Sequence, residues 1–129
     1  MAQRDVVLRW IEELGRLIAR LLRRGTAGDL DLAREEIERA TADLLGSLAP
    51  LVPQLDPASA AALLADPDRI FAWAQLVELD GLVAEAQGDA PGGASARRRA
   101  LELGREACRR SRIDRPDWAE WVAARSDPT

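Results

Sequence analysis

The sequence predicts an all-α protein, a single-domain bundle of about six helices over residues 1–129. Two observations carry this prediction. The stretch from Asp66 to Gln87 is apolar on almost every side of a helix, so it needs neighbours on several sides. In the rest of the chain, charged residues mostly alternate with apolar ones at helical spacing, and short clusters of Pro and Gly separate the segments.

The first helix is predicted from about Arg4 to Arg24, with Gly25 after its end. Its apolar arc is wide and consists of Val6, Val7, Trp10, Ile11, Leu14, Leu17, Ile18, Leu21 and Leu22. A helix at the edge of a small bundle needs only about 100° of apolar face. We therefore expect the arc to meet a second surface. That surface is either another copy of the chain, contacted through Trp10 and Leu17, or the last helix.

Part of this helix also resembles a known group of proteins. The residues that carry the resemblance are Asp5, Leu8-Arg9, Ile11-Glu12, Leu14, Arg16 and the run from Ile18 to Leu22. They are similar to the opening of an uncharacterised bacterial family of small helical proteins. The resemblance implies a small helical fold and brings no activity with it.

A second helix is predicted from Asp29 or Asp31 to Leu48. Because only the short turn Gly25–Gly28 joins it to the first helix, the two should form an antiparallel hairpin over residues 1–49.

Two prolines, Pro50 and Pro53, end this helix, and we expect the chain to cross the bundle there in an extended segment. Asp56-Pro57 is a helix-start signal, an N-cap residue followed by proline in the first turn. It predicts a short Ala-rich helix that ends at about Ala65.

The same signal recurs at Asp66-Pro67 and opens the central helix, which Gly88 closes. On a helical wheel, the residues left to face water are Asp68, Gln75, Glu78 and Glu85. Asp80 instead lies on the side of Trp73, which we expect to be buried. Because a buried carboxylate requires a partner, Asp80 is predicted to pair, for example with an Arg of the fifth helix. The alternatives are a ligand-binding or catalytic role, or a position that the wheel misplaces and that is not buried.

Gly88–Gly93 predicts a turn, followed by a fifth helix from about Ala94 to Arg112. A last helix is expected within residues 113–125, from Arg115 to Arg125 with Asp114 as its cap. Its packing face consists of Trp118, Trp121 and Val122.

Residues 66–112 are similar to a tetratricopeptide hairpin. Gly81 stands where that repeat has a small residue, Gly88-Asp89 matches its turn, and Ala100–Leu103 matches the end of its second helix. Asp80, Pro91–Gly93 and Arg105 depart from the pattern, and one copy is present. The resemblance implies a lone repeat-like hairpin that docks a peptide or a partner helix.

The composition argues against enzymatic chemistry. All 18 basic residues are Arg, and the absence of His, Lys and Tyr removes the commonest general bases and the Schiff-base nucleophile. A metal site would need carboxylates alone, and the Gly-rich turn lacks the spacing of a phosphate loop. We expect no cofactor and no metal, and Cys108 is interpreted as a small buried hydrophobe.

No apolar run is long enough to span a membrane, and the N-terminus has no signal-peptide pattern. A single cysteine permits no internal disulfide. These features predict a cytoplasmic protein without a membrane segment.

Charge is distributed unevenly, with an acidic centre over residues 26–96 and an Arg-rich segment over residues 97–115. Either the two pair with each other on folding, or the Arg-rich face binds a nucleic acid or another polyanion. The candidate contact residues are Arg98, Arg99 and Arg105, which we expect to lie outside the packed face.

Our hypothesis is a non-enzymatic protein–protein interaction or scaffold module, with self-association into a homodimer as an added hypothesis. Its candidate partner-binding residues are Trp10, Leu17, Arg98, Arg99 and Arg105, and Asp80 is the candidate buried polar residue. Binding of nucleic acid or another polyanion through the Arg-rich face is the alternative.

Overall fold

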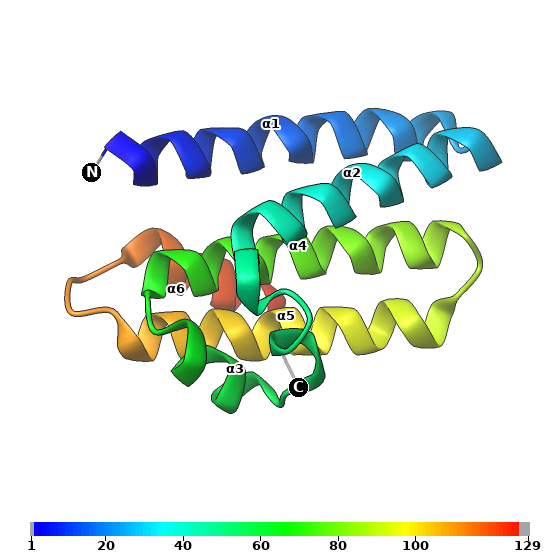
Figure 1. The fold of residues 1–129 in the computed structure, drawn as a ribbon. Coiled ribbons are helices and arrows are strands. Elements are labelled where there is room, and N and C mark those ends of the chain that lie inside the picture. Colours follow the sequence, from blue (N-terminus) through cyan, green and yellow to red (C-terminus); the bar gives the residue numbers. More distant parts are fainter. Residues whose placement is uncertain (1, 127–129) are drawn as a thin grey trace.

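A computed structural model describes the backbone of residues 2–126 and the side chains of residues 6–126. Over this range the chain forms a bundle of six α-helices and two short 3₁₀ helices, with no strand (Figure 1). The elements are α1 Ala2–Arg24, α2 Ala27–Leu45, η1 Gly46–Leu48, η2 Val52–Gln54, α3 Pro57–Leu64, α4 Pro67–Ala86, α5 Ala90–Arg110 and α6 Pro116–Arg125. The predicted all-α fold class is confirmed.

Helix α4 lies at the centre of the bundle, as predicted. It packs most extensively against α5 and also against α1, α2 and α3. Figure 1 shows α1 and α2 on one side of the antiparallel α4 and α5 pair, with α3 beside α5. Ile70, Trp73 and Leu76 of α4 are each at most 2% exposed, which makes them part of the hydrophobic core.

The face of α4 that was predicted to meet water is instead largely covered. Three of its acidic side chains form ion pairs with arginines from the C-terminal third of the chain: Asp68 with Arg115, Glu78 with Arg125 and Glu85 with Arg97. Their side chains are 12%, 21% and 32% exposed respectively. The wheel identified these positions as polar, but it could not show that other helices bring guanidinium groups to them.

The first two helices form the predicted antiparallel hairpin, but both ends of α2 differ from the prediction. Helix α2 begins at Ala27, before the predicted Asp29 or Asp31, because Thr26 is the N-cap. The Thr26 hydroxyl oxygen accepts a hydrogen bond from the Asp29 backbone N–H at 3.1 Å.

The other end of α2 is also corrected, since the α-helix stops at Leu45 and not at Leu48. Arg69 of α4 donates hydrogen bonds to the carbonyl oxygens of Leu44 at 2.9 Å and of Leu45 at 2.6 Å. These bonds satisfy two carbonyl groups that a helix end leaves unpaired. A residue distant in sequence therefore stabilises the point at which α2 ends.

The segment after α2 was predicted to be extended, and this prediction is wrong. The chain turns there through the two 3₁₀ helices, η1 and η2, and Val52 is fully buried. Asp56 then caps α3, because its carboxylate accepts a hydrogen bond from the Ser59 backbone N–H at 3.1 Å. Hydrogen bonds from Ser59 also lower the pKa of Asp56, so the cap is strongest above the ordinary pKa of 3.8 and is lost in acid.

Helix α5 begins at Ala90, earlier than the predicted Ala94, and ends at Arg110 rather than Arg112. Asp89 caps it by accepting a hydrogen bond from the Gly92 backbone N–H at 2.9 Å. Gly93, which was predicted to lie in a turn, is buried in the first turns of the helix. Gly93 lies here because α5 approaches α4 closely: a Cβ at Gly93 would come within 2.9 Å of the Gly81 carbonyl oxygen.

This contact predicts opposite effects for two Gly→Ala substitutions within helices. Gly93→Ala should lower the free energy of unfolding by about 1–3 kcal/mol, because the added methyl group meets the Gly81 carbonyl and the Glu85 side chain. Gly15→Ala should raise it by about 0.5–1 kcal/mol, since a Cβ there meets nothing within 4 Å and alanine favours the helix. Urea denaturation of the two variants compares them, and a similar gain from both would contradict the close approach of α4 and α5.

The last helix begins at Pro116, with Arg115 in the cap position. Asp114 was predicted to be the cap, but this helix start has no side-chain cap hydrogen bond. The predicted packing face is confirmed for Trp118, which is 1% exposed, while Trp121 and Val122 are half-buried.

Candidate functional site

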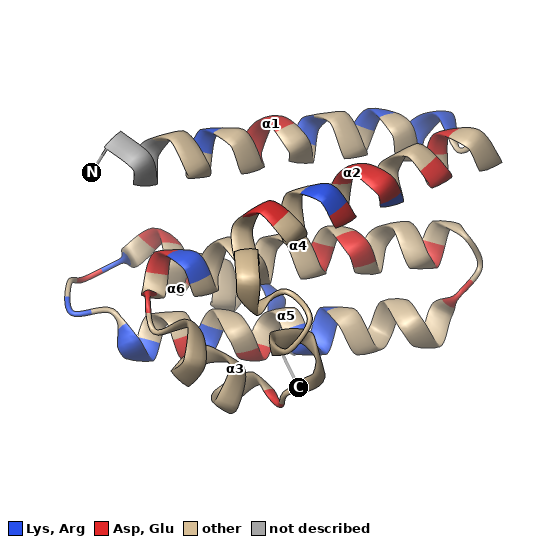
Figure 2. Cartoon of the chain, in the orientation of Figure 1, with Lys and Arg blue, Asp and Glu red and all other residues tan. Residues whose placement is uncertain are grey.

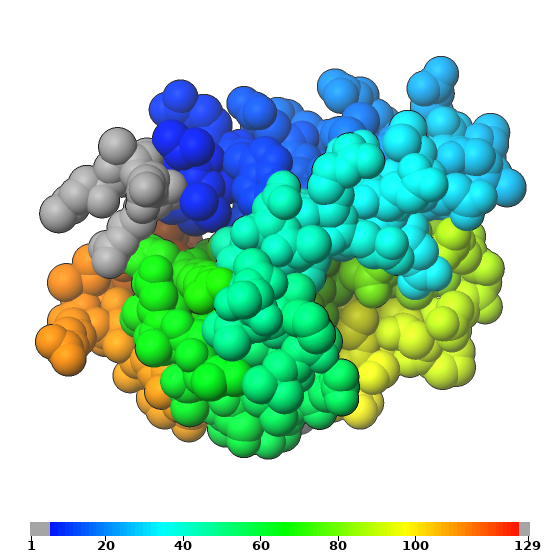
Figure 3. Space-filling model, in the orientation of Figure 1, coloured from blue at the N-terminus to red at the C-terminus, as the bar shows by residue number. Residues whose placement is uncertain are grey.

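Two of the residues singled out in the sequence, Asp80 and Arg99, line the same groove. This central groove lies between α2 and α5, has α4 as its floor and has a volume of about 650 Å³. Its lining comprises Arg34, Ile37, Glu38, Thr41, Ala42, Ala49, Pro53, Trp73, Leu76, Val77, Asp80, Gly92, Ser95, Ala96 and Arg99. Figure 3 shows, from the same side as Figure 1, how α2 and the segment after it lie over the α4 and α5 pair.

The floor of the central groove is apolar and its rim is polar. Trp73 and Leu76 form the buried part of the floor, and Val77 and Ala96 are half-buried. Ser95 is exposed on the α5 rim. The rim also carries both signs of charge. An apolar floor with a few polar groups along its edge is the usual composition of a binding site.

Asp80 lies at one end of the central groove. It was predicted to be buried, and this prediction is wrong. Its side chain is 42% exposed, and its carboxylate is 3.8 Å from the Arg34 guanidinium, which is 43% exposed. The partner comes from α2, whereas an Arg of the fifth helix was expected. Trp73 and Asp80 share one side of α4, but Trp73 is 2% exposed whereas the Asp80 side chain is 42% exposed.

Because the Asp80 and Arg34 pair is half-exposed, removing it should have little effect. We expect Asp80→Leu and Asp80→Ala to change the free energy of unfolding by no more than about 0.5 kcal/mol each. Thermal or urea denaturation measures this change. A loss above about 2 kcal/mol for Asp80→Ala alone would indicate a buried charge pair and contradict the exposed position.

Arg99 lies at the other end of the central groove and is half-buried, although it was predicted to lie outside the packed face. Its guanidinium carbon is 5.2 Å from the centre of the Trp73 ring. Its Nη2 atom donates a weak 3.4 Å hydrogen bond to the carbonyl oxygen of Val52. Burial lowers the pKa of Arg99. Among the side chains that the structure describes, no carboxylate forms an ion pair with Arg99.

The other two arginine candidates lie elsewhere. Arg98 is exposed and has no ion-pair partner among residues 6–126. Arg105 is exposed on α5, where it donates a 3.3 Å hydrogen bond to the Ser126 hydroxyl and lines a shallow groove toward α6. The three candidates therefore do not form one common site.

Most of the remaining arginines in the Arg-rich segment are engaged within the fold. Arg97 and Arg115 pair with acidic residues of α4, and Arg109 and Arg110 pair with Glu106. Within residues 6–126, Glu106 is the acidic residue that is buried, at 8% exposed, and the sequence analysis did not single it out. Glu106 precedes Arg109 by three residues and Arg110 by four, and this helical spacing was the sequence signal that could have predicted the two ion pairs. Figure 2 shows that acidic residues predominate on α2 and α4 and basic residues on α1 and α5, although each of these helices carries both charges.

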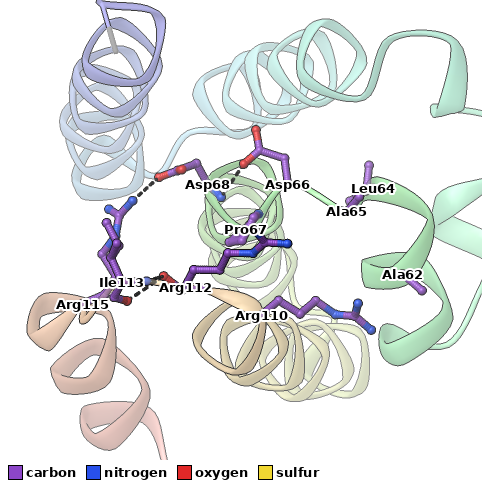
Figure 4. Close-up of a pocket in the computed structure, with 11 residues that line it drawn as sticks. Ala62, Leu64, Ala65, Asp66, Pro67, Asp68, Arg110, Arg112, Ile113 and Arg115 are labelled. Atoms are coloured by element: carbon purple, nitrogen blue, oxygen red, sulfur yellow. Dashed lines mark hydrogen bonds and ion pairs between the residues drawn. The ribbon is translucent and has the colours of Figure 1, made fainter.

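A second cleft, of about 730 Å³, lies where α3 and the start of α4 face the end of α5 and the loop after it (Figure 4). Arg115 closes one side of it, with its Nη2 atom 3.0 Å from the Asp68 carboxylate and its guanidinium 4.3 Å above the Trp118 ring. Figure 4 shows Arg112 crossing this cleft in front of Pro67. Acidic and basic side chains both line the cleft, which gives it no strong preference for an anion.

Trp10 and Leu17 lie on α1 and are half-buried, packed against the hydrophobic core. Helix α1 contacts both α2 and α4, so two helices share the cover of its wide apolar arc. The width of the arc is therefore largely explained within one molecule. Neither expected cover, a second copy or α6, is needed to explain it.

Cys108 is half-buried on the groove between α5 and α6, beside Arg105. Burial raises the pKa of its thiol, and the negative charge of Asp117 acts in the same direction. The thiol is therefore protonated at neutral pH and is a poor nucleophile.

Within the described side chains, no group of three or more acidic or cysteine residues is placed to hold a metal ion. In that same part of the chain, every helix is too short or too polar to span a membrane. Comparisons with known protein families, with curated proteins and with solved structures found no match. The two resemblances drawn from the sequence therefore stay predictions.

Proposed function

We propose that the protein is a non-enzymatic interaction module that binds a segment of a partner protein in the central groove. The observation that carries this proposal is the apolar floor formed by Leu76, Val77 and Ala96 between two charged ends, Arg99 and Asp80. Apolar contacts supply affinity in such a groove, and the charged ends supply orientation.

A chain segment suits the groove better than a small molecule does. Exposed residues from both walls, such as Glu38 of α2 and Ser95 of α5, leave the groove open along its rim, whereas small-molecule sites enclose most of their ligand. The distance along α4 from Trp73 to Asp80 is about 10 Å, from the helical rise of 1.5 Å per residue. An extended chain covers that distance with about three residues.

Binding of a nucleic acid or another polyanion through the Arg-rich face is the alternative. Such binding requires several arginines free to contact phosphates together. Arg97, Arg109, Arg110 and Arg115 are paired with acidic residues of the same chain, which counts against the alternative. A cytoplasmic location belongs to the proposal too, and the single cysteine is consistent with it.

Self-association through Trp10 and Leu17 stays a prediction of its own. The residue of the α1 arc that is most open to a second copy is Val6, at 64% exposed. Sedimentation equilibrium at micromolar concentration tests for a dimer, and a mass of 14.1 kDa would exclude one at that concentration.

The proposed function is tested with a library of randomised peptides displayed on phage. Peptides selected on the wild type are synthesised with a fluorescent label, and their affinities are measured by fluorescence anisotropy. The variant Ser95→Trp places a large side chain on an exposed position of the central groove. Its matched control is Ala94→Trp, on the neighbouring exposed position outside the groove.

We expect Ser95→Trp to weaken binding of the selected peptides by about tenfold or more, which corresponds to about 1.4 kcal/mol. Ala94→Trp should leave their affinity within about twofold of the wild type. Equal binding by both variants would place the peptide outside the central groove and overturn the proposal.

A further inference from the structure

We infer that the segment bound in the central groove carries one Asp or Glu, whose carboxylate pairs with Arg99, and an apolar residue two positions away that lies on Val77 and Ala96. This inference names the chemistry of the partner and rests on the proposed function. It follows from the charge state of the groove, from the position of its apolar floor and from the spacing between the two.

The first step is that no described carboxylate lies within 4.0 Å of the Arg99 guanidinium, and Glu102 and Asp56 act on it only from a greater distance. Its guanidinium is half-buried over the Trp73 ring, and its one hydrogen bond to the protein is the weak 3.4 Å contact with the Val52 carbonyl. Half of the eight arginines of the Arg-rich segment make an ion pair, and none is found for Arg99 among the described side chains. This half-buried guanidinium has lost water without gaining a direct ion pair, and the carboxylate of a bound segment would supply one.

The second step is the position of the apolar floor. Val77 lies one turn beyond Trp73 on α4, which corresponds to about 6 Å along the helix axis. In an extended chain, residues i and i+2 point to the same side and lie about 7 Å apart. A carboxylate over Trp73 and Arg99 therefore places the residue two positions away over Val77 and Ala96.

The third step is that the groove accepts a single acid. Its other charged positions include Asp80, which is paired with Arg34, and Glu38, which has no ion-pair partner in the described part of the chain. A second carboxylate at that end of the groove would meet negative charge. The preferred segment is thus acidic at one position and not acidic throughout.

The experiment uses the peptides selected on the full-length wild-type protein. Each peptide is resynthesised with its acidic residue changed to the matching amide, Glu to Gln or Asp to Asn, which preserves shape and removes charge. The protein variants are Arg99→Gln and, as a matched control, Arg98→Gln. Arg98 is the adjacent exposed arginine of α5 outside the groove, and its variant loses the same charge.

We expect the amide peptides to bind the wild type about tenfold more weakly than the acidic ones, the size typical of a charge-assisted hydrogen bond. Arg99→Gln should weaken binding of the acidic peptides by a similar factor. This variant should bind the acidic and the amide peptides with equal affinity. Arg98→Gln should behave like the wild type. The wild-type comparison of acid and amide peptides requires no protein variant, so it stands even where Arg99→Gln affects folding.

Two results would overturn the inference and leave the proposed function intact. One is that peptides sensitive to Ser95→Trp show no preference for an acidic residue. The other is that Arg98→Gln and Arg99→Gln weaken binding of the acidic peptides equally, which would show that only the net charge of the protein matters. Peptides that are insensitive to Ser95→Trp would instead overturn the proposed function itself.

Discussion

Trp73→Ala is expected to lower the free energy of unfolding by about 3–5 kcal/mol. Trp73 is 2% exposed at the centre of α4, and its ring lies below Arg99 on the floor of the central groove. The substitution removes a large apolar surface and leaves a cavity that the surrounding helices fill only in part. Urea denaturation followed by far-ultraviolet circular dichroism measures the change.

The control for this prediction is Leu32→Ala. Leu32 lies on α2 and is 42% exposed, so its truncation should cost less than about 1 kcal/mol. A similar small loss for Trp73→Ala would show that α4 is not the centre of the core.

Trp118→Ala should also lower the free energy of unfolding by about 3–5 kcal/mol, because Trp118 attaches α6 to the bundle. Its side chain is 1% exposed and stacks on Phe71 of α4, with ring centres 4.5 Å apart and planes 14° apart. Arg115 covers the ring from outside at 4.3 Å. The same denaturation measurement applies.

Two substitutions on α6 calibrate this result. Glu120→Ala changes an exposed position of the same helix and should alter stability by no more than about 0.5 kcal/mol. Trp121→Ala should have an intermediate effect, because Trp121 is half-buried and meets Phe71 edge-on at 5.3 Å. Equal effects of Trp118→Ala and Glu120→Ala would mean that α6 does not pack on the core.

The helices themselves were largely predictable, because the signals that start and end them are local. Asp56 and Asp66 each precede a proline and each accepts a hydrogen bond from a backbone N–H of the first helical turn. The apolar residues around α4 likewise required neighbours on several sides, and the structure provides them. Capping and apolar periodicity depend on residues within a few positions of one another.

The Gly-rich stretch shows where local signals fail. Pro91, Gly92 and Gly93 were interpreted as a turn because glycine and proline usually interrupt helices. Proline is favoured in the first turn of a helix, however, and here it lies there. Gly93 is required by the close approach of α5 to α4. Local rules consider only residues near one another in sequence, so they do not detect this contact.

The candidate site depended even more on tertiary structure. A helical wheel projects all residues onto one plane, so it placed Asp80 beside Trp73 and predicted that both are buried. In the structure Trp73 is buried, whereas Asp80 stays exposed at the groove and pairs with Arg34. Arg99 was predicted to lie outside the packed face, yet it is half-buried over Trp73 and donates a hydrogen bond to the Val52 carbonyl oxygen of the segment after α2.

The amino-acid sequence by itself determined the all-α class, the order of the helices and the identity of the central one, because hydrogen bonds and apolar spacing within a helix act over a few residues. Only the tertiary structure decided which polar residues meet water, which charges are paired and where a groove opens. Glu78 and Glu85 are polar in any helix, but their exposure depends on Arg125 and Arg97, which lie on other helices. Burial and pairing are properties of the contacts between helices, and those contacts join residues far apart in the chain.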